Sequence, residues 1–248
     1  MPWTVLARLD VTRARADRTL YVLAGFLALV GLGLGWGVAH VESRSGVAAL
    51  PALVSPVVGF LLALNGAVFA AESIPDDRAS GRTRLSLALP HRRRDLVVGT
   101  AAGRGLVVAA TGVLAVAVAA GTATVFGANV AVTPAVRLAA ATGLFGATCV
   151  GPVVAVSALT RSGRLALALS LAVAGLVLAW GPVLRTVVDV VLGSADQPWL
   201  DTVASLWPYR TFVELATGNA GPEAVAVLAG WALLPLVLGA VALERGDL

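Results

Sequence analysis

The residue types that most often do chemistry are scarce in this chain. It has two histidines, His40 and His91, a single cysteine, Cys149, and no lysine. A Walker A loop needs a lysine on the nucleotide phosphates, and Schiff-base enzymes need a lysine amine. A lone cysteine inside an apolar run forms no intrachain disulfide and no cysteine metal cluster, so Cys149 is interpreted as a small buried hydrophobic residue. The sequence therefore predicts no catalytic residue and no metal site.

The composition indicates what kind of elements surround these residues. Of 248 residues, 58% are hydrophobic and 13% are charged, and the mean hydropathy is +0.89. A soluble domain has about 25% charged residues, so the chain belongs with membrane proteins. Its net charge of +4 comes from arginines that flank apolar runs. This pattern is typical of membrane topology and of contact with anionic lipids, so no nucleic-acid partner is expected.

The only long polar stretch covers residues 72–95. It contains six arginines: Arg78, Arg82, Arg84, Arg92, Arg93 and Arg94. Placing one arginine at the bilayer centre costs about 2.5–3.5 kcal/mol, so this segment must lie in water or among lipid headgroups.

The remaining sequence predicts an all-α membrane protein with six transmembrane helices in a single domain, because its apolar runs are long enough to cross a bilayer. The expected spans are about 19–39, 47–71, 96–126, 138–159, 165–182 and 224–243. Pro51 and Pro56 predict a kink in the second span, or a start near Pro56.

Two further segments are expected to lie at the membrane surface. Residues 1–18 predict an interfacial helix, with a polar leader as the alternative. Residues 184–221 are rich in aromatic side chains and predict an external amphipathic segment, either an interfacial belt or a short hairpin dipping into the membrane.

Four glycines in the first span, Gly31, Gly33, Gly35 and Gly37, alternate with larger residues. Glycines at such spacing let another helix approach closely, so we expect them to form a helix-packing face. The alternative is that glycine is simply common in membrane helices.

The arginine distribution predicts the orientation of the spans. The leader, residues 72–104, the turn 161–164 and the carboxyl terminus hold fourteen arginines, whereas the opposite connections hold four. The positive-inside rule then places both termini and the polar stretch in the cytoplasm. The acidic residues, including Asp189, lie in connections or near span ends, which disfavours a proton-coupled carrier because such a carrier keeps a carboxylate at mid-membrane.

The polar stretch and its flanks carry a resemblance. A glutamate ends the second span, followed by a glycine, a leucine run, Pro-x-Arg and a glycine in the third span. The matching residues are Glu72, Gly81, Leu85, Leu87, Leu89, Pro90, Arg92 and Gly99. Together with the six-span layout, this pattern resembles the permease subunits of type-2 ABC transporters, the ABC-2 permeases. Such proteins often have a lysine after the last glycine of this pattern, where Thr100 stands here.

The resemblance implies an ABC-2 (type V exporter-like) architecture in the cell membrane and a division of labour between subunits. Two permease subunits pair, as a homodimer or with a paralogue, and separate ATP-binding subunits, which hold ATP and Mg, dock on their cytoplasmic faces. This chain itself is expected to hold no cofactor and to be no enzyme. The implied docking residues are Arg8, Glu72, Gly81, Arg84, Leu85, Leu89, Pro90, Arg92, Arg93 and Arg94. ATP-driven closure then switches the permease pair between inward-open and outward-open states, usually for export.

Three alternatives stay open at this point. The arginines of residues 72–95 can bind anionic lipid alone, without docking a protein. The chain can also be a membrane scaffold with no transport cycle, or a secondary carrier. No substrate-binding residue is identified, although spans of Ala, Val, Leu and Gly suit a lipidic or amphipathic cargo better than a small ion.

Overall fold

The computed structural model describes residues 2–16, 18–45, 49–71, 73–75, 93–160, 162–192 and 198–245. Over these ranges the chain forms helices and no strands. The helices are α1 (Pro2–Ala16), α2 (Arg18–Ser45), α3 (Leu50–Ala71), α6 (Arg93–Val125), α7 (Val132–Leu159), α8 (Gly163–Leu192), α9 (Pro198–Ala204), α10 (Pro208–Thr217) and α11 (Glu223–Arg245).

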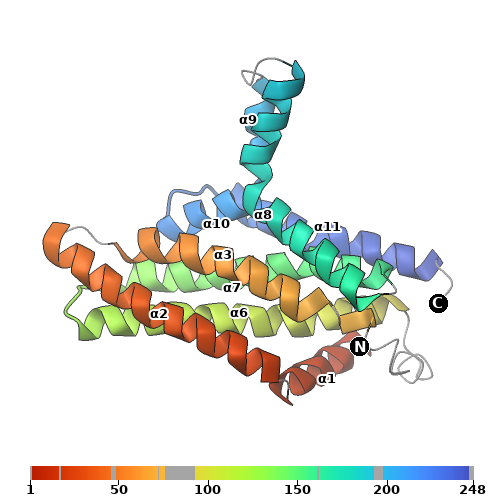
Figure 1. The fold of residues 1–248 in the computed structure, drawn as a ribbon, viewed down its shortest axis with the longest axis horizontal. Helices are drawn as coiled ribbons and strands as arrows, with labels where there is room; N and C mark the ends of the chain where they lie inside the picture. The colour runs from red at the N-terminus through yellow and green to blue at the C-terminus, as the bar shows by residue number, and fades with distance from the viewer. Residues whose placement is uncertain are drawn as a thin grey trace.

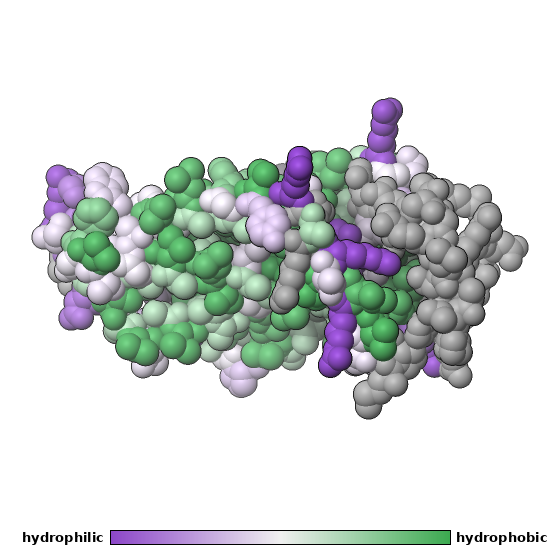
Figure 2. Space-filling model, turned by 90° about the horizontal axis from the view of Figure 1, so that it is seen from below, coloured by the Kyte–Doolittle hydropathy of each residue, from purple (hydrophilic) through white to green (hydrophobic). Residues whose placement is uncertain are grey.

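Six of these helices, α2, α3, α6, α7, α8 and α11, are long and apolar enough to cross a membrane. Helices α2, α3, α6, α7 and α11 extend along the long axis of the molecule, as does the first half of α8 (Figure 1). Apolar surface covers much of the left half and middle of the face in Figure 2, and hydrophilic residues lie at its left end and to the right of the middle. Large apolar side chains are also exposed on the outer faces of the helices, as expected for contact with lipid. The prediction of an all-α, multi-pass membrane protein is confirmed.

Helix α7 lies at the centre of the bundle. In the apolar 18-residue segment of α7, 67% of the residues are buried, compared with 17% for α11 and 22% for α8. Thr148 of α7 donates a hydrogen bond to the carbonyl of Leu228 in α11, at 3.1 Å. Because α7 is surrounded by other helices, its interior residues are fixed by packing, whereas α8 and α11 present most of their surface outward.

Helices α2 and α6 approach closely along two of the four glycines expected to pack. A Cβ added to Gly31 would lie 2.6 Å from the Ala115 carbonyl oxygen, and one added to Gly35 would lie 2.7 Å from Thr122 Cβ. At Gly33 and Gly37 a Cβ would meet no atom within 4 Å. The face of α2 that packs against α6 therefore contains Gly31 and Gly35, because residues four apart share a helix face and the intervening pair points away from α6.

Helix α8 runs further than the sequence indicates. The expected fifth span ends at about 182, with a continuation past Pro182 left open, and a separate amphipathic segment is expected from 184. In the structure α8 continues to Leu192 with Pro182 inside it. A proline removes one backbone donor and bends a helix without necessarily ending it. Figure 1 shows the second half of α8, with α9 beside it, projecting away from the bundle. Residues 184–192 are therefore part of the helix of the fifth span.

Two other helices begin at residues that differ from the expected starts. Helix α3 begins at Leu50 and passes through Pro56, so the alternative of a start near Pro56 is wrong. Helix α7 begins at Val132, six residues before the expected start at 138, with Pro134 in its first turn. A proline in the first turn costs little because the amide groups there have no intrahelical acceptor.

The short helix α10 is fixed to the bundle by side chains from three regions. The Tyr209 hydroxyl donates to the Pro56 carbonyl at 2.9 Å, and Phe212 stacks on Phe145 with centroids 4.5 Å apart. Arg137 donates to the carbonyls of Ala216 and Thr217, at 3.3 and 3.0 Å. A cation is favourable at a helix carboxyl terminus, where carbonyls have no intrahelical donor. Burial raises the pKa of Tyr209, so the phenol remains a hydrogen-bond donor at neutral pH.

Candidate functional site

The candidate site lies where α1 crosses the start of α6. Two glycines of α6 face α1 at this crossing. A Cβ on Gly99 would lie 2.7 Å from Leu6 Cβ, and one on Gly103 would lie 2.9 Å from Asp10 Cβ. Gly99 and Gly103 are four residues apart on α6, as Leu6 and Asp10 are on α1, so both contacts lie on one face of each helix. The absence of side chains at these two positions lets α1 lie directly against the α6 backbone.

An ion pair joins the same two helices. The side chain of Asp10 on α1 lies 3.5 Å from Arg104 on α6, measured from carboxylate Oδ2 to guanidinium Nε. The two side chains are largely buried, with 12% of Asp10 and 21% of Arg104 exposed. A charge buried to this degree is costly unless it is paired, so the two residues depend on each other.

Arg104 also reaches α3. Its guanidinium donates to the carbonyl of Phe69 and lies 4.6 Å from the centre of the Phe69 ring, in a cation–π contact. One side chain therefore connects α1, α6 and the last turn of α3. We call Asp10, Arg104 and Phe69 the three-helix junction.

The polar stretch is described only at its two ends, which adjoin helices of the three-helix junction. Ser73 and Ile74, which follow α3, are buried and lie against α7: the Ile74 amide donates to Ser157 Oγ at 3.3 Å. The chain is described again from Arg93, where α6 begins, eleven residues before Arg104. Residues on both sides of the polar stretch are thus in helices that the junction connects.

Most of the implied docking residues fall outside the described ranges: Glu72, Gly81, Arg84, Leu85, Leu89, Pro90 and Arg92. Arg93 is the first residue of α6, and the Arg94 side chain is exposed in the first turn. Arg8 is exposed on α1, two residues from Asp10. Their assignment to docking stays a prediction.

Sequence reasoning did not single out the three-helix junction. A signal for it was present, because Arg104 lies inside the apolar third span and Asp10 is one of two carboxylates within the mainly basic leader. The sequence did not reveal the pair for two reasons. An arginine near a span end can also snorkel to the headgroups, and the contact with Asp10 depends on how α1 crosses α6. Among the described residues, no group of three or more His, Cys, Asp or Glu side chains is placed to hold a metal ion.

Comparison with known proteins identifies the family. The profile described as "ABC-2 family transporter protein" matches residues 6–248, nearly the whole chain. The chain belongs to the ABC-2 family of transporter proteins. The resemblance inferred from the polar stretch and the six-span layout is thereby confirmed.

A named relative of this ABC-2 protein is similar over part of its length. It is the "Probable ABC transporter permease protein NosY" of Pseudomonas aeruginosa strain PAO1, with 28% identity over 110 residues. The matched segment covers 43% of this chain and 40% of the relative.

Proposed function

We propose that this ABC-2 protein is the membrane-spanning permease subunit of an ATP-driven ABC transporter and that it works as an exporter. A separate ATP-binding subunit holds ATP and Mg and hydrolyses the nucleotide. Hydrolysis then drives a pair of permease subunits, two copies or a paralogous pair, between inward-open and outward-open states. The complex lies in the cell membrane with both termini of this chain in the cytoplasm.

The observation that carries the proposal is the three-helix junction. A subunit that takes mechanical work from a partner needs its docking elements joined rigidly to its spans, because a mobile connection would absorb the displacement. Asp10 and Arg104 join the interfacial helix α1 to α6, and Arg104 joins both to the end of α3. A movement imposed on α1 or on residues 72–95 is therefore transmitted to two spans.

Sequence composition supports the same division of labour. With no lysine, the chain lacks the residue with which a Walker A loop contacts nucleotide phosphates. The arginines of residues 72–95 offer charge-assisted hydrogen bonds to an acidic surface on the ATP-binding subunit.

Charge reversal tests docking directly. The variant carrying Arg92→Glu, Arg93→Glu and Arg94→Glu should insert into the membrane but lose the ATP-binding subunit, because like charges repel at the contact. The measurement is co-purification of the ATP-binding subunit with tagged permease.

The matched control is Arg161→Glu with Arg164→Glu, which reverses charge in another short connection predicted on the same side. This control should retain the partner. Undiminished co-purification by the triple variant would rule out the proposed docking surface. If this chain is instead a scaffold protein, the ATPase activity of the ATP-binding subunit should be the same with and without this chain.

A further inference from the structure

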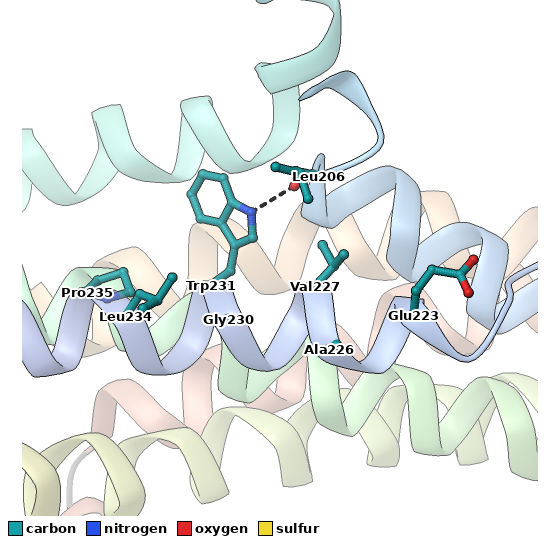
Figure 3. A pocket seen from close by; sticks show the side chains of 8 residues that line it. All are labelled: Leu206, Glu223, Ala226, Val227, Gly230, Trp231, Leu234 and Pro235. Carbon is teal, nitrogen blue, oxygen red and sulfur yellow. Dashed lines mark hydrogen bonds between the residues drawn. The ribbon is translucent and has the colours of Figure 1, made fainter. Parts of the chain in front are cut away.

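A groove lies along the first half of α11, away from the three-helix junction. Its floor is formed by Ala226, Val227, Gly230 and Leu234, and its volume is about 520 Å³. Figure 3 shows these residues along one side of the helix, below the chain at Leu206. Only 17% of the residues in the apolar segment of α11 are buried, so the groove lies on a helix that presents most of its surface outward.

One wall of the groove is an aromatic ring held in a fixed orientation. The Trp231 indole N–H donates to the Leu206 carbonyl at 2.8 Å, drawn as the dashed line in Figure 3. Its ring also packs edge-on against Trp180, with centroids 6.2 Å apart. Because its N–H is already used, Trp231 offers a bound molecule its ring, which attracts apolar groups and cations.

The groove carries a negative charge at one end. Glu223, in the first turn of α11, is exposed and lines the groove. Among the described residues it has no ion-pair partner. Two arginines of the neighbouring segment are already paired, Arg185 with Asp201 at 2.9 Å and Arg210 with Glu214 at 2.7 Å.

We propose that this groove binds amphipathic cations. The apolar body of the ligand lies along Ala226, Gly230 and Leu234 beside the Trp231 ring, and its positive group lies next to the Glu223 carboxylate. An anion of the same shape is repelled by Glu223, and a neutral molecule of the same shape gains no ion pair. The proposal adds a ligand class to the proposed function. The binding test needs no ATP-binding subunit, so the proposed ligand class and the proposed transport function can each fail without the other.

The probe is tetraphenylphosphonium, an apolar body with one positive charge, and tetraphenylborate is its anionic counterpart of the same shape. The full chain is purified into nanodiscs of phosphatidylcholine, and binding of radiolabelled phosphonium is measured with and without unlabelled competitor. We expect saturable binding of the phosphonium. Glu223→Gln should weaken it about tenfold, the equivalent of about 1.4 kcal/mol.

Asp189→Asn is the charge-matched control, because Asp189 is exposed on α8 and does not line the groove. It should leave phosphonium affinity unchanged. Glu223 also suits the amino terminus of a helix, where a carboxylate is stabilising, so thermal unfolding is measured for both variants. A purely structural role would lower the unfolding temperature of Glu223→Gln without changing its preference for phosphonium over borate.

Filling the groove tests its location independently of charge. A Cβ at Gly230 would meet no atom within 4 Å, so Gly230→Leu should fold and occupy the space that the ligand needs. Gly175→Leu, on the outward surface of α8, is the matched control because a Cβ there also meets nothing within 4 Å. Gly230→Leu should abolish saturable binding, and Gly175→Leu should not.

Several outcomes would overturn the proposal. One is wild-type affinity in Glu223→Gln, and another is competition by tetraphenylborate as effective as that by unlabelled phosphonium. Absence of saturable binding, or binding retained in Gly230→Leu, would show that the groove is filled by bilayer lipid or that the ligand binds elsewhere.

Discussion

Arg104 occupies a position where an unpaired charge would be costly. It lies within a transmembrane helix, its side chain is 21% exposed, and its partners are a carboxylate, a backbone carbonyl and an aromatic face. These partners come from two other helices, α1 and α3. Removing the guanidinium takes away the positive charge beside the buried Asp10 carboxylate, whereas a broken ion pair at the surface is replaced by contacts with water.

This difference predicts unequal effects for two arginine substitutions. Arg104→Gln should lower the free energy of unfolding by about 3 kcal/mol, since it removes the positive charge that lies beside the buried Asp10 carboxylate. Arg185→Gln breaks a pair whose side chains are 50% and 81% exposed, and should cost about 0–1 kcal/mol. Thermal unfolding in detergent checks both values, and equal losses would contradict the role assigned to Arg104.

The same junction makes a prediction about coupling. In the assembled complex, Asp10→Asn should leave the ATP-binding subunit bound, because Asp10 is buried in the contact between α1 and α6. It should nevertheless reduce transport per ATP hydrolysed, because α1 is less firmly joined to α6. Co-purification and a ratio of transport to hydrolysis are measured together, and an unchanged ratio would show that the ion pair only stabilises the fold.

At the level of helices, close packing depends on which glycines face a neighbour. Gly31 and Gly35 lie against α6, whereas Gly33 and Gly37 have no atom within reach of an added Cβ. Without a hydrophobic driving force between helices in lipid, such backbone approach supplies much of the association through van der Waals contact.

A pair of alanine substitutions separates these positions. Gly35→Ala places a Cβ 2.7 Å from Thr122 Cβ and should destabilise the bundle by about 1–3 kcal/mol through overpacking. Gly33→Ala adds the same methyl group where there is space, and should be neutral or slightly stabilising because alanine favours helix. The measurement is the unfolding temperature of each variant. A larger decrease for Gly33→Ala than for Gly35→Ala would contradict the observed packing of α2.

At the scale of the whole molecule, the orientation of six spans determines which partners the chain can meet. The polar stretch of residues 72–95 docks a cytoplasmic ATP-binding subunit only if it faces the cytoplasm. The connection between α10 and α11, which contains the exposed Asn219, then lies outside the cell.

Cysteine accessibility tests this orientation. In a Cys149→Ala background, Asn219→Cys should react with a membrane-impermeant maleimide in intact cells, whereas Ser80→Cys, within the polar stretch, should react only after lysis. The native cysteine is buried, so its replacement by alanine removes a background site at modest cost to packing. Reaction of Ser80→Cys in intact cells would invert the topology and exclude the proposed docking.

The sequence by itself determined the class of the protein, the number of spans and the family. Long apolar runs separated by arginines can adopt few structures in a bilayer. Each run forms a helix, because every backbone polar group must be hydrogen-bonded within its own segment. Glu72, Pro90 and Arg92 also lie at fixed offsets along the chain, so their pattern can be recognised without coordinates. By contrast, the expected end of the fifth span at about 182 is too early, because α8 continues through Pro182 to Leu192.

Only the tertiary structure decided which residues meet. The contact between Asp10 and Arg104, the choice of Gly31 and Gly35 over their neighbours, and the groove beside Trp231 all depend on how helices cross. Crossing geometry arises from packing between segments far apart in the chain, and hydrophobic periodicity within one segment carries no information about it.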